Sequence, residues 1–97
     1  MVTRIVKMTF QNDGIAEFLR IFDHYQSRIR GAEGCTSLAL LRDTSDERVF
    51  FTYSQWEKAE YIDQYRQSEV FGEVWPRVKT LFAEPAQAWS VESIVAL

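Results

Sequence analysis

The sequence predicts an α+β domain in which helices cover one face of a four-stranded antiparallel sheet. Its 97 residues are the length of one domain with a single hydrophobic core, residues 1–97. Hydrophobic residues make up 46% of the chain and charged residues 26%, which is typical of a soluble globular protein. The hydrophobic pattern switches along the chain between a period of two and a period near 3.6 residues, which indicates alternating strands and helices.

A strand and a helix are predicted for the first third of the chain. Residues 3–10 alternate, with Val6, Met8 and Phe10 on one face, as in a half-buried strand. Residues 15–29 follow the helical period. The face of this helix that we expect in the core carries Ile15, Phe18, Leu19, Phe22, Gln26 and Ile29.

Two strands are predicted in the middle of the chain. Residues 31–34 begin and end with glycine, which terminates the helix, and residues 35–41 then predict the second strand. A polar turn separates it from residues 49–56, a run of strongly β-forming side chains. Because Phe50 and Phe51 are neighbours, both faces of this third strand carry a large apolar group and need cover from two sides.

The last third predicts two helical segments and a strand. Residues 58–66 suggest a short helix, and Ser68 is a good N-cap for the next one. We expect a kink or break at Trp75–Pro76, because proline removes a backbone donor inside the helix. Pro85 indicates a turn before a final strand over residues 87–94.

The predicted order is β-α-β-β-α-β, which is the split βαβ arrangement of ferredoxin-like folds. The helices then cover one sheet face only. Because the other face is also apolar, we expect a second copy of the chain to cover it, in a homodimer.

The scarcity of reactive side chains excludes several kinds of site. A single cysteine, Cys35, forbids an internal disulfide and a cysteine-based zinc site, and a single histidine, His24, forbids a two-histidine metal centre. His24 falls on the solvated face of its helix, where an ordinary surface histidine and a general base are both compatible with the pattern. No metal site is predicted.

Charge and hydropathy argue against nucleic-acid and membrane partners. The net charge of −3 has the wrong sign for binding a phosphate backbone, and the third strand lacks the glycines of RNA-recognition modules. No apolar stretch approaches the roughly 20 residues of a membrane span. The N-terminus has no basic region followed by an apolar block, so we expect no signal peptide and a cytoplasmic protein.

The aromatic residues of the second half form the remaining constellation. Tyr53 and Trp56 end the third strand, while Tyr65, Phe71 and Trp75 lie on the predicted helices. Aromatic side chains at this spacing are compatible with a packed core. They are also compatible with the wall of an apolar cavity that binds a flat organic ligand.

Several short motifs occur in an order that supports a family resemblance. They are Phe18-Leu19 with Phe22, Gly34-Cys35, Leu38 with Leu40 and Asp43, Phe50-Phe51 with Tyr53 and Trp56-Glu57, and Ser68-Glu69 with Phe71. In this order the chain resembles the antibiotic biosynthesis monooxygenase-like family of dimeric α+β barrels. The resemblance implies a homodimer with facing sheets. It also implies cofactor-free oxygenation of small polycyclic phenols or quinol-like compounds, in which the deprotonated substrate supplies electrons to O2.

Other members of this superfamily degrade heme, and their residues are mostly missing here. They use an asparagine on the first strand, a tryptophan at the end of the third and an axial histidine on the last helix. Only the tryptophan is matched, by Trp56; the other two positions fall near Val6 and at Trp75. Heme degradation is therefore disfavoured.

The sequence thus leads to a functional hypothesis and an alternative. The hypothesis is a monooxygenase without metal, flavin or other cofactor, acting on a small aromatic or quinol-type compound. Tyr53 and Tyr65 would be catalytic, orienting the substrate or relaying a proton, and the substrate-binding residues would be Trp56, Arg66, Phe71 and Trp75. The alternative is a non-catalytic, small-ligand-binding or stress-related homodimer of the same fold.

Overall fold

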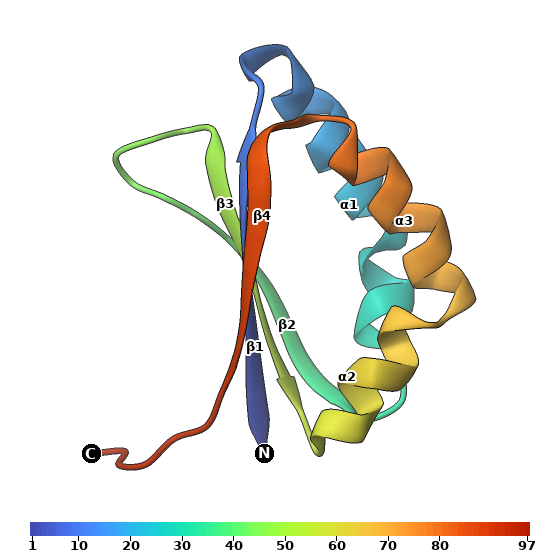
Figure 1. Cartoon of the computed structure of the whole chain (residues 1–97), viewed down its shortest axis with the longest axis vertical. Coiled ribbons are helices and arrows are strands. Elements are labelled where there is room, and N and C mark those ends of the chain that lie inside the picture. The colour runs from blue at the N-terminus through green and yellow to red at the C-terminus, as the bar shows by residue number, and fades with distance from the viewer.

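The chain folds into two layers, a four-stranded antiparallel sheet and helices that cover one of its faces (Figure 1). The computed structural model describes residues 1–97. The elements in chain order are β1 (Val2–Phe10), a 3-10 turn (Asn12–Gly14), α1 (Ile15–Arg30), β2 (Cys35–Arg42), β3 (Val49–Trp56), α2 (Ala59–Arg66), α3 (Glu69–Lys79) and β4 (Phe82–Val91). This is the predicted α+β, ferredoxin-like arrangement, in which the two helical segments predicted for the last third are α2 and α3.

The sheet has the strand order β2-β3-β1-β4, so β2 and β4 are its edges. Val6 in the centre of β1 pairs with Thr52 of β3 on one side and with Ala88 of β4 on the other. Because successive side chains alternate between faces, these three residues all point toward the helices. Their sequence neighbours point to the opposite face, which carries no helix (Figure 1).

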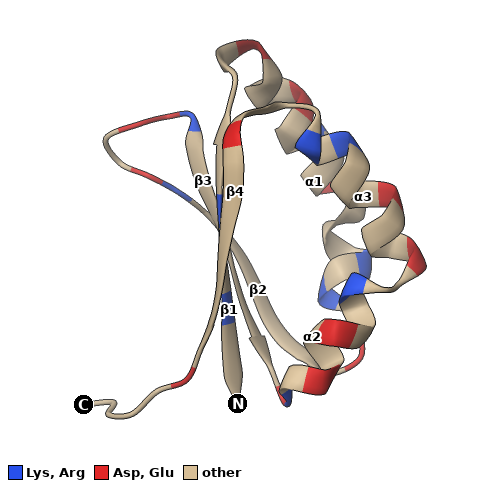
Figure 2. Ribbon diagram, in the orientation of Figure 1, with Lys and Arg blue, Asp and Glu red and all other residues tan.

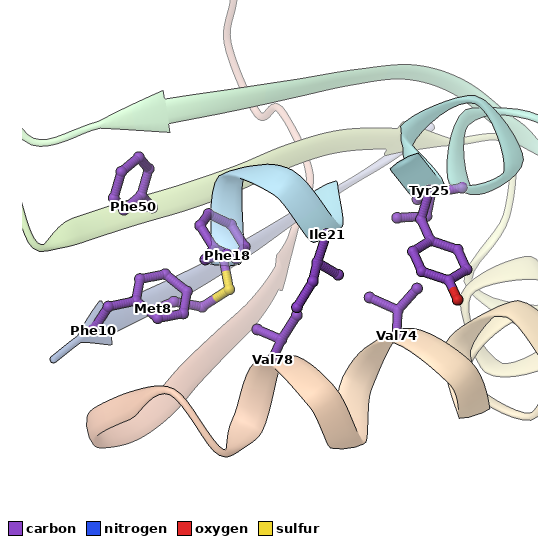
Figure 3. Packing of buried hydrophobic residues seen from close by; sticks show 9 residues of the cluster. Met8, Phe10, Phe18, Ile21, Tyr25, Phe50, Val74 and Val78 are labelled. Atoms are coloured by element: carbon purple, nitrogen blue, oxygen red, sulfur yellow. The ribbon is translucent and has the colours of Figure 1, made fainter. Parts of the chain in front are cut away.

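Three phenylalanines form the centre of the core between sheet and helices. Phe10, Phe18 and Phe50 are the largest fully buried side chains, and the rings of Phe10 and Phe18 stack with centroids 4.2 Å apart. Figure 3 shows this cluster beside Met8. The prediction that β1 turns Met8 and Phe10 inward is confirmed.

The buried face of α1 differs from the prediction. Gln26, expected in the core, is exposed, whereas Ile21 and Tyr25 are buried. Figure 3 shows the reason: Ile21 and Tyr25 point toward Val74 and Val78 of α3, which packs beside α1. The other predicted residues of this face are confirmed, since Phe18 and Ile29 are buried and Ile15, Leu19 and Phe22 pack against the core. The buried face of α1 is therefore set by α3 as well as by the sheet.

Both prolines are accommodated inside regular elements. The expected break at Trp75–Pro76 is wrong, because α3 continues from Glu69 to Lys79 with Pro76 inside it. The last strand begins at Phe82 and contains Pro85, which was expected in a turn. An edge strand tolerates this proline, and the register between β1 and β4 shifts beside it, between Lys7 and Thr9.

Figure 2 shows that charged residues concentrate on the helices and in the loop joining β2 to β3, while the sheet carries few. None of the helices combines the length and the apolar character needed to cross a membrane. No group of three or more His, Cys, Asp or Glu side chains is arranged so that it could hold a metal ion.

Candidate functional site

A cavity of about 430 Å³ lies between the sheet and the helices. Every strand and every α-helix contributes to its lining, and 15 of the 19 lining residues are hydrophobic. Its volume is in the range of small-molecule sites, about 300–1,000 Å³. The size and apolar lining fit a flat organic molecule of a few rings.

One wall of the cavity is a continuous row of aromatic rings. Trp56 at the end of β3 lies 5.5 Å from Tyr65 of α2, and Tyr65 lies 5.4 Å from Phe71 of α3, measured between ring centroids. Phe71 and Trp75 are stacked at 5.7 Å with an interplanar angle of 11°. These two residues are four apart in one helix, which places them on the same face.

The junction of α2 and α3 positions this row. Ser68 is the N-cap of α3, as predicted, and its hydroxyl oxygen accepts a hydrogen bond from the backbone N–H of Phe71. The same hydroxyl donates to the carbonyl oxygen of Tyr65, at 2.6 Å. One side chain thus ties the end of α2 to the start of α3 and brings the rings of Tyr65 and Phe71 together.

A buried hydrogen bond fixes the indole of Trp56. Its Nε1–H donates to the hydroxyl oxygen of Ser54, at 2.9 Å, and the Ser54 hydroxyl donates in turn to the backbone oxygen of Arg4. Trp56 is only 2% exposed. Because a buried indole N–H needs a partner, Ser54 holds the ring in one orientation at the edge of the cavity.

The polar side chains of the cavity include no ordinary acid–base catalyst. Besides the hydrophobic residues, the lining holds Arg4, Thr52, Ser54 and Arg66, and no histidine, carboxylate or lysine. Burial raises the pKa of Tyr65 to about 12, because a low-dielectric surrounding disfavours the phenolate. Tyr65 is therefore protonated at neutral pH, where its hydroxyl can donate a hydrogen bond but cannot serve as the proton acceptor.

The structure brings five of the six predicted site residues together. Trp56, Tyr65, Arg66, Phe71 and Trp75 all line the cavity. Tyr53 does not, because residues three apart on a strand point to opposite faces and Trp56 faces the helices. Tyr53 lies on the helix-free face, 38% exposed, and pairs with Ile5 and Ala39.

The sequence pattern contained a residue that we did not single out. Arg4 lies on β1 two positions before Val6, so it shares the inward face with Val6 and Met8 and lines the cavity. A charged residue that follows the same alternation as buried apolar residues is an unusual feature. Extending the alternation of Val6, Met8 and Phe10 by two positions toward the N-terminus would have identified Arg4.

Comparison with known proteins agrees with this architecture. A family model described as antibiotic biosynthesis monooxygenase matches residues 1–75. No curated protein matches the chain.

Solved structures with the same fold cover nearly the whole chain. One, an antibiotic biosynthesis monooxygenase, has a TM-score of 0.91 at 16% identity and covers 98% of this chain and 100% of its own. A protein from Bordetella bronchiseptica assigned to the same family has a TM-score of 0.86 at 24% identity, with 97% of each chain covered. SnoaB, a cofactor-independent oxygenase from Streptomyces nogalater, has a TM-score of 0.86 at 16% identity, covering 99% of this chain and 95% of its own.

At these identities the solved structures show a shared fold, whereas the family model matches the sequence itself over most of its length. The chain belongs to the antibiotic biosynthesis monooxygenase family.

Proposed function

We propose that this protein is a cofactor-independent monooxygenase acting on a small aromatic or quinol-type compound bound in the cavity. The observation that carries the proposal is the apolar cavity walled by Trp56, Tyr65, Phe71 and Trp75. Family membership and the fold shared with the cofactor-independent oxygenase SnoaB support it. A site of this kind acts by positioning and desolvating its ligand.

In the proposed reaction the substrate itself is the reductant. Once deprotonated, it donates electrons to O2 within the cavity. One oxygen atom becomes a carbonyl on the ring carbon, which loses two hydrogens, and the other oxygen atom leaves as water. Trp56, Phe71 and Trp75 would hold the ring plane, and the Tyr65 hydroxyl would donate a hydrogen bond that orients the substrate oxygen.

The test is oxygen uptake with a panel of anthrone- and quinol-type compounds. In Ala88→Leu, a larger side chain projects into the cavity from β4, so we expect kcat/KM to fall by about 10-fold or more. Ala16→Leu on the exposed side of α1 is the matched control and should keep its activity. Equal uptake by the two variants would place the reaction outside this cavity.

A second function, ligand binding without turnover, is favoured by one observation: the cavity holds no ordinary proton acceptor. Quenching of tryptophan fluorescence by the same compounds, with no oxygen uptake above that of heat-inactivated protein, would select this function. The fluorescence of Trp56 and Trp75 reports on the cavity directly, because both rings line it.

We also propose that the protein is a homodimer formed through the helix-free face of the sheet. Leu41, Tyr53, Trp89 and Val91 are between 38% and 46% exposed on this face. Phe51, which pairs with Leu41, is half-buried on the same face. Since a second copy presents the same apolar face, two sheets packed together would cover both.

A further inference from the structure

Two arginines are the only charged residues that line the cavity. Arg4 comes from β1 and Arg66 from the last turn of α2, so the sheet and the helical layer each supply one guanidinium. All other lining residues are uncharged. The charges that line the cavity are therefore both positive.

Neither arginine is engaged in an ion pair. The ion pairs of the chain join Arg20 with Glu17, Arg28 with Glu73 and Arg48 with Asp46, all away from the cavity lining. Arg4 donates one hydrogen bond, to the neutral hydroxyl of Ser90 at 3.0 Å. The Arg66 side chain makes no hydrogen bond within the chain, which leaves most of the ten guanidinium N–H donors available.

The two charges act on each other. Burial and then the positive charge of Arg66 lower the pKa of Arg4, and the carboxylate of Asp63 partly opposes this. Asp63 forms no ion pair with either arginine, and it does not line the cavity. An anion placed between the guanidiniums would relieve their repulsion and supply the acceptors that both lack.

We propose that the cavity binds its aromatic ligand as an anion, with a ring-bound oxyanion, carboxylate or phenolate, held by Arg4 and Arg66. The inference rests on the proposed function and names the substrate class. For a phenol, the O–H bond breaks, the proton passes to water at the cavity mouth, and the electron pair stays on the oxygen. The guanidiniums stabilise that charge, so the step needs no side-chain base.

The first arm of the test compares two ligands of the same shape under anaerobic conditions. By isothermal titration at pH 7.5, we expect 2-naphthoate to bind at least about 10-fold more tightly than neutral 2-naphthamide. Arg66→Gln and Arg4→Gln should each reduce that preference about 10-fold and leave the affinity for the amide nearly unchanged. Arg20→Gln, an exposed site on α1, is the matched control and should retain the preference.

The second arm uses a phenol whose ionised form absorbs differently, 4-nitro-1-naphthol. A 10-fold preference for the anion lowers the apparent pKa of the bound phenol by about one unit, because one unit corresponds to a tenfold ratio. Arg66→Gln should return it toward the value in free solution. Since Arg66 is exposed, this variant should keep the fold, and an unchanged thermal unfolding midpoint checks that point.

The inference is supported if the protein prefers the anion in either arm and the arginine variants lose this preference. A preference in the first arm identifies a carboxylate as the bound group, and a preference in the second identifies a phenolate. The inference would be overturned if 2-naphthoate and 2-naphthamide bound with equal affinity and the pKa of the bound phenol were unshifted. It would also be overturned if both arginine variants kept the full preference for the anion. The anaerobic readouts separate it from the proposed function. If anion binding depends on the arginines but no oxygen is taken up, only the proposed monooxygenase function is refuted. If neutral ligands are oxidised at the same rate in the wild type and in both arginine variants, only the anion site is refuted.

Discussion

Tyr65 and Tyr53 illustrate how one residue's orientation decides its role. Both are tyrosines close to Trp56 in sequence, and both were predicted to be catalytic. Tyr65 packs against Trp56 at the edge of the cavity, whereas Tyr53 lies on the opposite face of β3. The alternation along β3 does not by itself say which of its residues point toward the helices. The buried Trp56 shows this, and Tyr53, three residues before it, must then point to the opposite face.

We expect the conservative substitutions of these tyrosines to differ in activity. Tyr65→Phe removes a hydroxyl that would orient the substrate, and kcat/KM in the oxygen assay should fall about 10-fold, the value of one hydrogen bond of 1–1.5 kcal/mol. Tyr53→Phe removes the same group from the outer face and should leave kcat/KM unchanged. A loss in Tyr53→Phe equal to that in Tyr65→Phe would contradict the assignment of the cavity as the site.

The pKa of Tyr65 also predicts a dependence of stability on alkaline pH. The folded state holds this pKa at about 12, above the ordinary tyrosine value of 10.0, so the unfolded chain loses the proton first. Its contribution is fully present below pH 10 and is lost between pH 10 and pH 12, by about 2–3 kcal/mol. Urea unfolding across this range should show a shallower decline for Tyr65→Phe than for Tyr53→Phe, and parallel declines would refute the shift.

At the scale of elements, the sequence predicted types and order better than boundaries and faces. Alternation and helical spacing are local properties, so all four strands and the helical segments were found. The inward face of α1 depends on α3, which is far away in sequence, so Ile21 and Tyr25 were missed. Pro85 was expected in a turn because only the strand order shows that β4 is an edge.

Two glycines with different surroundings give opposite predictions for the same substitution. Gly34, at the turn between α1 and β2, has φ of 84°, and a Cβ there would overlap the ring of Tyr61. Gly34→Ala should therefore lower the free energy of unfolding by about 2–4 kcal/mol.

Gly72 is the matched control, because a Cβ at this position in α3 meets nothing within 4 Å. Gly72→Ala should raise the free energy of unfolding by about 0.5–1 kcal/mol through helix propensity and a less flexible unfolded chain. Urea titration of both variants measures the two effects. A Gly34→Ala protein as stable as the wild type would show that the turn adapts at no cost.

At the scale of the whole molecule, the adjacent pair Phe50-Phe51 predicted a sheet that is apolar on both faces. The structure places Phe50 in the core and turns Phe51 toward the helix-free face, beside Leu41. The fold of one chain thus accounts for one of the two faces. The helix-free face is covered only in an assembly with another chain. The alternating pattern of β3 predicts that this face is apolar, but it does not identify the chain that covers it.

Trp89 tests the proposed dimer, because it lies on the helix-free face of the edge strand β4, opposite Ile5 of β1, and is 44% exposed. Trp89→Glu would place a charge between the two facing sheets, where its desolvation is unfavourable. By sedimentation equilibrium at micromolar concentration, we expect the wild type at twice the 11.4 kDa chain mass and the variant at the chain mass.

His24→Glu, on the exposed side of α1, adds the same charge to a surface outside the proposed interface and should stay dimeric. A wild-type protein that sediments as a monomer would remove the dimer and leave the apolar face to a different partner. A dimer that persists in Trp89→Glu would instead move the interface to another surface of the same chain. Because the cavity lies on the other side of the sheet, Trp89→Glu should still bind 2-naphthoate, which separates assembly from ligand binding.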